Sequence, residues 1–331
     1  MPSCPTKLML WSPRAGPNSR FLLEAVFRQV ECGRCELTDN ANHADIILVS
    51  EIDPRRPLAN TAMRRLYRHH AKRMFFYSTD DKAIPWLPGI YASIEKRLYV
   101  VSRMRSGFYP IRVPAVIEMP DITGSELYLA CFVGAIATHP VRRGLLSLRH
   151  KNMLITDTSN HPSRDNGEED AINIYQRDYS EALKQSLFGL CPRGNGTSSV
   201  RLFECMAAGR SPVIISDDWV PPDGPDWDAF SVRVAERDVS SIDEKLRTLQ
   251  PRAQEMGALA RAAYQRWFSA EHAIETIINA CREIQSARRV NEGWHRLLAL
   301  SYFRSPFYLR YHLKPFLMDR LSSMIWRFRN V

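Results

Sequence analysis

The sequence predicts an α/β protein with two halves, each built around a parallel sheet that has helices on its faces. The first observation is an alternation of short apolar runs with helical patterns between residues 7 and 104, which is typical of parallel sheets. The second is that the same alternation returns between residues 129 and 287. The third is the length of 331 residues, 45% of them hydrophobic, which is enough for two domains with a core each.

In the first half, four apolar runs are expected to form strands: KLMLW (7–11), ADIILVS (44–50), MFFYS (74–78) and, less regular, RLYVVSRM (97–104). Two helical patterns lie between them. RFLLEAVFRQV (20–30) is apolar at helical spacing and follows Asn18 and Ser19, which are candidate N-caps. TAMRRLYRHHAKR (61–73) predicts a basic helix.

The second half repeats this order. Its expected strands are LACFVGAIA (129–137), NMLITDT (152–158), LFGLCP (187–192), SPVIIS (211–216) and FSVRVAE (230–236). Its expected helices are HPVRRGLLSLRH (139–150), DYSEALKQS (178–186), SSVRLFECMAAG (198–209), one from about residue 239, and a long one from about 253 to 287. The third of these ends at Gly209, a typical C-terminal stop.

We therefore expect a first domain over residues 1–122, a second over 123–287 and a helical tail over 288–331. The net charge of the chain is +9, and most of the excess lies in the tail. Basic side chains alternate there with aromatic ones. The tail carries nine Lys or Arg against Glu292 and Asp319: Arg288, Arg289, Arg296, Arg304, Arg310, Lys314, Arg320, Arg327 and Arg329.

Two interpretations of the tail stay open. It packs back on the body with its arginines in water, or it lies on an anionic membrane surface; nucleic acid is not expected as a partner. The longest uncharged run, residues 127–138, is too short to cross a bilayer, and the N-terminus lacks an export signal. Seven scattered cysteines fit a reducing cytosol.

One stretch carries the chemistry: CPRGNGTSSVRLFECMAAGRSPVIISDDW, residues 191–219. A loop rich in glycine and hydroxyl groups leads into a helix, and a helix start favours an anion through its free N–H groups and its dipole. Arg193 and Arg201 add positive charge, and Glu204 is an acidic side chain suited to a ribose. The alternative is a plain capped helix with an Arg201–Glu204 surface pair.

This stretch resembles the signature of the exostosin family, glycosyltransferase family 47. The resemblance is strongest over residues 187–239, where the Ser-x-Arg-x-x-Glu helix precedes a Pro-Val-Ile strand ending in Asp and the Trp-x-x-Phe-Ser-Val segment DWDAFSV. Upstream, CFVGAIATHPVRRGL is similar to the family's Phe-x-Gly strand followed by arginine. A weaker resemblance extends from about residue 75 to 287.

The resemblance implies a GT-B architecture, in which two Rossmann-like domains face each other across a cleft. It also implies inversion at the sugar carbon, with a UDP-sugar donor and no essential metal. In that case the developing charge on the β-phosphate is stabilised by arginines and a helix N-terminus. The side chains expected at the nucleotide sugar are Arg142, Arg143, Arg193, Gly194, Asn195, Thr197, Ser198, Ser199, Arg201, Glu204, Asp217 and Asp218.

An inverting displacement needs a general base for the acceptor hydroxyl. Asp80 and Asp81 follow the strand MFFYS and are the first choice, with His139 as the second. Asp217 and Asp218 follow SPVIIS and are expected at the donor sugar, with turn formation as the alternative. Asp226-Trp227-Asp228 matches a metal-binding DxD pattern, which we reject because it lies inside the exostosin-like segment.

The expected function is glycosyl transfer to a glycan or lipid-linked glycan in surface polysaccharide synthesis. Family members from eukaryotes carry a membrane anchor and luminal disulfides. The lack of both here predicts a bacterial-type enzyme in the cytoplasm or on the inner face of the plasma membrane. The rivals are a fucosyltransferase-like enzyme with a GDP-sugar, whose Thr-Glu-Lys helix pattern is missing, and a nucleic-acid-binding protein.

Overall fold

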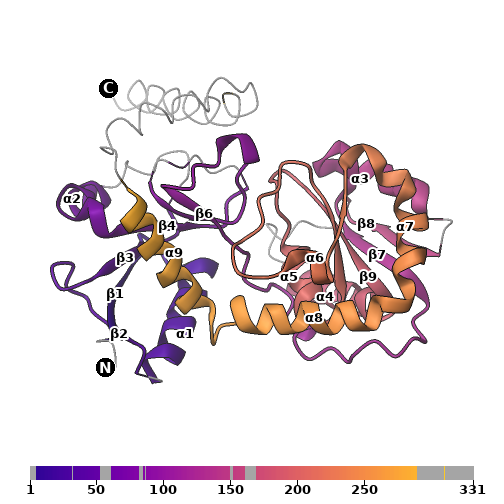
Figure 1. Ribbon diagram of the computed structural model, residues 1–331, viewed down its shortest axis with the longest axis horizontal. Helices are drawn as coiled ribbons and strands as arrows, with labels where there is room; N and C mark the ends of the chain where they lie inside the picture. Colours follow the sequence, from indigo (N-terminus) through magenta and orange to yellow (C-terminus); the bar gives the residue numbers. More distant parts are fainter. Residues whose placement is uncertain are drawn as a thin grey trace, which may run out of the picture.

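A computed structural model of the chain describes residues 5–31, 33–52, 61–81, 85, 87–149, 152–160, 169–288 and 309. Two α/β lobes lie side by side, one formed by the first part of the chain and the other by the second (Figure 1). The expected tail lies outside the described residues apart from Arg288 and Leu309. No helix within the described ranges is long and apolar enough to cross a bilayer.

The first domain has a six-stranded sheet in the order β2-β1-β3-β4-β5-β6, and every pair is parallel. The four residues of β3 and the five of β4 are all buried, as expected for central strands covered on both faces. The strands are β1 (Thr6–Trp11), β2 (Cys35–Leu37), β3 (Ile46–Val49), β4 (Met74–Ser78), β5 (Gly89–Tyr91) and β6 (Met104–Ser106).

The second domain repeats the plan with a five-stranded parallel sheet in the order β11-β10-β9-β7-β8. In both sheets the chain runs outward from the first strand in two directions, which is the doubly wound topology of Rossmann-like domains. The expected architecture of two such domains is confirmed. The strands are β7 (Tyr128–Gly134), β8 (Met153–Asp157), β9 (Ser186–Pro192), β10 (Ser211–Ile215) and β11 (Val232–Val234).

Helices cover both faces of each sheet. In the first domain α1 (Pro17–Glu31) and α9 (Ala273–Ala287) pack on one face, while α2 (Thr61–His70) and the 3-10 turn η1 (Ala71–Arg73) lie on the other. In the second domain α4, α5 and α8 cover one face, and α3 and α7 the other. Their bounds, with the short α6, are α3 (Pro140–Gly144), α4 (Glu169–Lys184), α5 (Val200–Ala207), α6 (Trp227–Phe230), α7 (Ile242–Leu249) and α8 (Ala253–Trp267).

The prediction of one long helix from 253 to 287 is wrong. The segment is two helices, α8 and α9, separated by residues 268–272. The break lets the chain turn back, so that α9 crosses to the first domain and contacts β5 and α1 (Figure 1). Residues 273–287, which we expected in the second domain, therefore complete the core of the first.

The expected strand over residues 97–104 is also wrong. A 3-10 turn, η2 (Lys96–Leu98), occupies its start, and β6 begins only at Met104. Two short strands, β2 and β5, were not predicted. Each has three residues, and β5 lies among prolines and glycines, so neither leaves a periodic pattern in the sequence.

The two domains share one continuous core. Phe108, just after β6, has its ring 5.9 Å from that of Phe21 in α1, 6.1 Å from Phe203 in α5 and 5.1 Å from Phe268 after α8. Closer to the surface, Arg105 of β6 lies 3.5 Å from the carboxylate of Asp223 in the second domain. These contacts hold the carboxyl edge of the first sheet against the second domain.

Candidate active site

Each sheet has a topological switch point, where neighbouring strands connect in opposite directions and ligands of doubly wound folds bind. In the second domain it lies between β7 and β9. Arg142 of α3 occupies this crevice and is only 6% exposed. Its guanidinium donates hydrogen bonds to the carbonyls of Ala135 (3.0 Å), Pro192 (3.3 Å) and Arg193 (2.9 Å). Arg142 thus ties together the two loops that follow these strands.

Arg201 lies beside it, in the first turn of α5. Its guanidinium donates to the carbonyl of Val133 at 2.8 Å and to the hydroxyl of Tyr175 at 2.9 Å. Arg142 and Arg201 both contact the ring of Phe132, at 5.4 and 5.1 Å from its centroid. Burial, together with the charge of Arg201, lowers the pKa of Arg142. An anion nearby would relieve this repulsion.

Two glycines make room for these arginines. A Cβ on Gly194 would lie 2.8 Å from Nη2 of Arg142, and a Cβ on Gly134 would overlap Nη2 of Arg201. At both positions a side chain approaches the backbone so closely that only glycine fits. Gly194 belongs to the loop predicted to bind an anion, so one glycine of that loop has a structural cause, whereas Gly134 ends β7.

Arg193 follows β9 and faces the next loops of the same edge. Its Nη1 lies 3.6 Å from carboxylate oxygens of both Asp218 and Glu236, and its buried Nε has no hydrogen-bond partner. Arg143 and Asn195 are exposed. This edge of the second domain thus gathers Arg142, Arg193 and Arg201. Arg142 and Arg201 hold backbone carbonyls, whereas Arg193 faces two carboxylates.

The loop at 196–199 packs against the first domain. Ser93, after β5, accepts a hydrogen bond from the backbone N–H of Thr197 at 2.7 Å, and the Thr197 hydroxyl donates to the carbonyl of Ile94 at 3.0 Å. Ser198 and Ser199 are buried as well; the Ser198 hydroxyl has no partner, and Ser199 begins α5 without a side-chain capping bond. The expected open polar turn is therefore a closed one that lies in the seam between the domains.

Asp81 meets this loop from the other side. The phenol of Tyr109 donates to Oδ1 of Asp81 at 2.6 Å, and a Cβ on Gly196 would lie 2.8 Å from the same oxygen. Burial and the Asp81 carboxylate raise the pKa of Tyr109, so the phenol keeps its proton and donates. Asp81 thus belongs to the first domain but lies against the arginine-bearing loop of the second.

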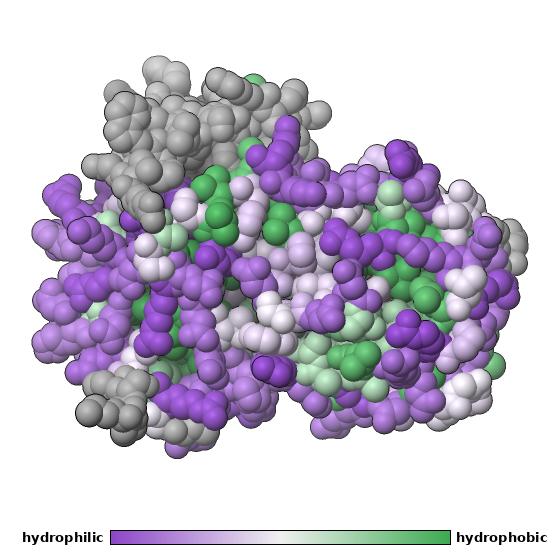
Figure 2. Space-filling view, in the orientation of Figure 1, coloured by the Kyte–Doolittle hydropathy of each residue, from purple (hydrophilic) through white to green (hydrophobic). Residues whose placement is uncertain are grey.

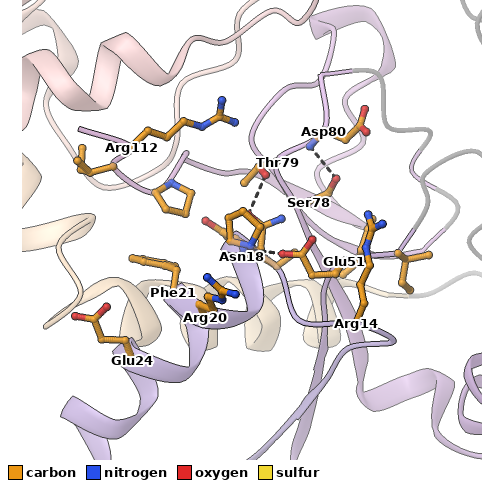
Figure 3. A pocket seen from close by; sticks show the side chains of 16 residues that line it. Arg14, Asn18, Arg20, Phe21, Glu24, Glu51, Ser78, Thr79, Asp80 and Arg112 are labelled. Atoms are coloured by element: carbon orange, nitrogen blue, oxygen red, sulfur yellow. Dashed lines mark hydrogen bonds between the residues drawn. The ribbon is translucent and has the colours of Figure 1, made fainter. Parts of the chain in front are cut away.

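A pocket of about 470 Å³ opens at the switch point of the first sheet, between β1 and β3 (Figure 3). Asn18 and Glu51 line its floor. The Glu51 carboxylate accepts the backbone N–H of Asn18 at 2.7 Å, so a carboxylate already satisfies the start of α1. Asn18 in turn accepts a hydrogen bond from Thr79 at 2.9 Å. Glu51 adopts a left-handed backbone, with φ of 56°, to reach this position.

Charged side chains surround the opening of this pocket. Arg112 and Asp80 lie on either side of it in Figure 3. Arg14, Arg20 and Glu24 complete the rim, so that the lining contains three arginines and three carboxylates. A pocket that offers donors and acceptors in equal measure suits a polyhydroxylated ligand such as a sugar.

The position of Glu204 differs from the one expected for a side chain that binds a ribose. Glu204 is 3% exposed, and its Oε1 accepts the backbone N–H of Arg112 at 3.3 Å. Its carboxylate joins α5 to the first domain and does not face an open site for a ribose. The helical spacing that placed Glu204 near Arg201 was correct, but the domain packed above it was invisible in the sequence.

His139 and Asp217 have local roles. His139 caps α3, because its Nδ1 accepts the N–H of Val141 at 3.3 Å. Burial and the charges of Arg193 and Arg142 lower the pKa of His139. With its acceptor nitrogen engaged, the neutral ring presents N–H to the site and is a poor general base. The backbone N–H of Asp217 donates to Oε1 of Glu236, and the backbone N–H of Glu236 donates to Oδ1 of Asp217, both at 3.1 Å. This is the turn role left open from the sequence.

Asp226 and Asp228 are exposed at either side of the buried Trp227. The Trp227 indole donates to the carbonyl of Pro222 at 2.8 Å, which anchors the turn. Across the described ranges, no three His, Cys, Asp or Glu side chains gather in a way that could hold a metal ion.

Sequence reasoning missed the first-domain partners of the site: Ser93, Tyr109, Arg112, Glu51 and Arg14. Four of them follow the carboxyl end of a strand within three residues, and that rule would have found Arg14 after β1 and Glu51 after β3. Ser93 and Tyr109 follow the short strands β5 and β6, whose positions the sequence did not reveal.

Fold and site together define a class of protein: two Rossmann-like domains with a basic crevice in one and a polar pocket in the other, joined at a shared seam. The comparisons with known proteins narrow this class. The family model of the Exostosin GT47 domain matches residues 97–249. The match begins before β6 and ends with α7, and it includes the whole arginine-rich edge.

Two relatives illustrate the similarity. The chain is 32% identical over 162 residues to the Exostosin-1 homolog of Caenorhabditis elegans, covering 43% of this chain and 41% of that protein. It is 41% identical over 73 residues to the probable beta-1,4-xylosyltransferase IRX10 of Arabidopsis thaliana, covering 22% of this chain and 18% of that protein. The chain thus spans well under half the length of either relative. Residues 97–249 of the chain are therefore similar to the exostosin family of glycosyltransferases.

Among solved structures, the crystal structure of an α1,3-fucosyltransferase is similar over 85% of this chain and 90% of that chain, with 11% identity and a TM-score of 0.43. This is a loose similarity.

Proposed function

We propose that the protein is an inverting glycosyltransferase that moves a sugar from a UDP-sugar to a glycan or lipid-linked glycan, without an essential metal. The observation that carries the proposal is the position of Asp81. It lies in the first domain, yet it contacts the loop that follows β9, next to the arginines at the switch point of the second sheet. A base on one domain thus meets a cationic edge on the other.

In the proposed reaction the acceptor occupies the pocket of the first domain. The Asp81 carboxylate takes the proton of the acceptor hydroxyl, and the oxygen attacks the anomeric carbon of the donor sugar. The bond from that carbon to the β-phosphate oxygen breaks, and its electron pair leaves with UDP. Positive charge at the site of the leaving group lowers the barrier most when it is already in place, because no reorganisation is then required.

The arginines have two different roles in the proposed reaction. Arg142 and Arg201 hold the loops and add fixed charge, whereas Arg193 and Arg143 are the side chains proposed to contact the diphosphate. The Nε of Arg193 is buried without a partner, which supports a ligand contact there. Asn195, Ser198 and Asp218 remain proposed donor contacts. Glu204 is left out of the donor site because its carboxylate is buried in the seam.

The experiment is calorimetry with UDP and GDP in the presence of EDTA. Wild-type protein is expected to bind UDP, and Arg193→Ala to lose at least about tenfold in affinity, as for a charged hydrogen bond. Arg237→Ala is the matched control, because Arg237 lies on the same side of the second sheet with its side chain 87% exposed. GDP binding in place of UDP would support the fucosyltransferase-like rival. Binding that needs a divalent cation would end the metal-independent proposal.

Two further parts of the proposal concern location. A cytoplasmic position on the inner face of a membrane suits a lipid-linked acceptor, and residues 288–331 are proposed to contact an anionic surface there. The tail lies outside the described residues apart from Arg288 and Leu309, so this part rests on its composition alone.

A further inference from the structure

Helix α2 presents a basic outer face that the proposed reaction does not use. Met63 and Tyr67 are buried against the sheet, while Arg64, Arg65 and Arg68 are exposed. At about 100° per residue, these three arginines fall within an arc of about 100° on the helix. Hydrophilic residues cover this edge of the molecule, at the left of Figure 2, where α2 lies.

Among the described residues, no carboxylate pairs with the three arginines of this face. The sequence has no Asp or Glu between residues 61 and 79. Within the described ranges, the one side-chain contact of the three arginines is a 3.2 Å hydrogen bond from Arg64 to Thr61. Of the other basic groups here, His69 is exposed. His70 accepts a hydrogen bond from Arg73, and burial, Arg73 and His69 lower its pKa.

The fold brings a further arginine, Arg288, to the same domain edge. Arg288, at the end of α9, donates to the carbonyls of Ala71 (3.1 Å) and Lys72 (3.3 Å) in η1. Arg288 therefore contacts η1, the turn that directly follows α2. Arg288 and η1 are more than 200 residues apart in the sequence, and the return of α9 to the first domain brings them together.

Exposed aliphatic side chains lie on the same face of the sheet. Val100 and Val101 are 42% and 60% exposed, in the crossover between β5 and β6. Their neighbour Tyr99 packs with Leu66 of α2 on the same core cluster. Exposed arginines and exposed aliphatic groups on one face of a domain match an interfacial membrane surface, where charges meet headgroups and aliphatic groups enter the acyl boundary.

We propose that the outer face of α2, together with η1 and Val100–Val101, docks on the surface of an anionic lipid bilayer. The docking surface is independent of the proposed chemistry. It would hold the first domain, and with it the pocket proposed for the acceptor, at the membrane.

Vesicle flotation with the full-length chain tests the proposal. The vesicles are 7:3 phosphatidylcholine to phosphatidylglycerol, with pure phosphatidylcholine as the uncharged reference. The wild-type protein is expected to float with the anionic vesicles only. Loss of each arginine should weaken partitioning about fivefold, so the triple variant R64E/R65E/R68E should lose at least about a hundredfold.

The matched control is R237E/R247E/R252E, which makes the same change in net charge on exposed arginines of the second domain. It should retain most of the binding. Equal loss in the two triple variants would show that net charge alone attracts the protein. Full retention in R64E/R65E/R68E would show that another segment carries the binding. Either result overturns the proposal, as does a wild-type protein that ignores anionic vesicles.

A second variant separates a membrane from nucleic acid. V100S/V101S should weaken vesicle binding, because aliphatic insertion is lost while every charge is kept. If this variant binds vesicles as the wild type does, and duplex RNA or DNA displaces the vesicles, the surface is a nucleic-acid site and the proposal is wrong. Calorimetry with UDP on R64E/R65E/R68E distinguishes the membrane proposal from the proposed function. UDP affinity should be unchanged in this variant, and unchanged affinity also shows that the variant is folded.

Discussion

At the scale of single residues, the site depends on side chains that approach the backbone closely. Gly194 is required because the guanidinium of Arg142 lies 2.8 Å from where a Cβ would be. Arg142 in turn satisfies three carbonyls at the ends of two strands. Backbone carbonyls at such an edge have no partners within the sheet, and a buried arginine can satisfy several of them with one side chain.

Asp81 and Asp80 are expected to contribute differently to turnover. Asp81→Asn keeps the shape and still accepts from Tyr109, but it cannot take a proton. Turnover is expected to fall about 10²- to 10⁴-fold, the range for loss of a general base. Asp80→Asn should keep turnover within a few-fold and mainly alter KM, because Asp80 lines the pocket.

The measurement is the initial rate of UDP release with a competent donor and acceptor, for both variants over a range of acceptor concentrations. The reverse result, with turnover lost in Asp80→Asn and kept in Asp81→Asn, would transfer the role of base to Asp80. Normal turnover in both would remove these carboxylates from the reaction.

At the scale of elements, α9 decides how the first domain is completed. Its apolar face reaches the first sheet only because the helix before it ends at Trp267. Ile274, Ile277 and Ile284 are at most 1% exposed. Apolar residues at spacings of three, four and seven predicted a helix correctly, but this period does not say which sheet the helix covers. The sequence reading therefore joined α8 to α9.

Removing one of these side chains should destabilise the protein measurably. Ile274→Ala deletes three carbons at a fully buried position and is expected to lower the free energy of unfolding by about 2–5 kcal/mol. Ile174→Ala in α4 is the matched control, since Ile174 is 45% exposed, and it should change stability by less than about 0.5 kcal/mol. Urea denaturation followed by circular dichroism measures both. Equal effects would mean that α9 is not part of the core.

At the scale of the whole molecule, one core cluster runs through both domains. It includes Leu22 of α1, Phe108, Phe203 of α5 and Ile274 of α9. Domains that share a buried core unfold together, whereas domains joined by a wet polar interface tend to move and unfold separately. The seam also carries Ser93, Asp81 and Thr197, so the geometry of the proposed reaction depends on the same contact.

We therefore expect one calorimetric unfolding transition in the wild-type protein. Phe108→Ala removes the ring at the centre of the seam, at a cost of about 3–5 kcal/mol, and should split the transition into two. Phe27→Ala, at a position 51% exposed on α1, is the control and should leave a single transition. Two resolved transitions in the wild type would contradict a shared core.

Most of the elements could be predicted from the sequence, because long apolar runs and helical periods are local properties. β1, β3, β4, β8, β9 and β10 lie within a residue or two of their expected bounds. The short strands and the break at 268–272 escaped prediction because three residues carry no period and because only contacts with the distant first sheet make the break necessary. Within the site, the arginines and the loop were predicted, whereas their partners were not.

The sequence by itself determined that the chain is an α/β protein of two halves and that residues 191–219 carry an exostosin signature, since both depend on the order of residues along the chain. Only the tertiary structure decided which groups meet. It turned Glu204 inward against Arg112 and set Asp81 against the loop at Gly196. The physical reason is that burial and pairing depend on the packing of segments about 100 residues apart, which no local pattern encodes.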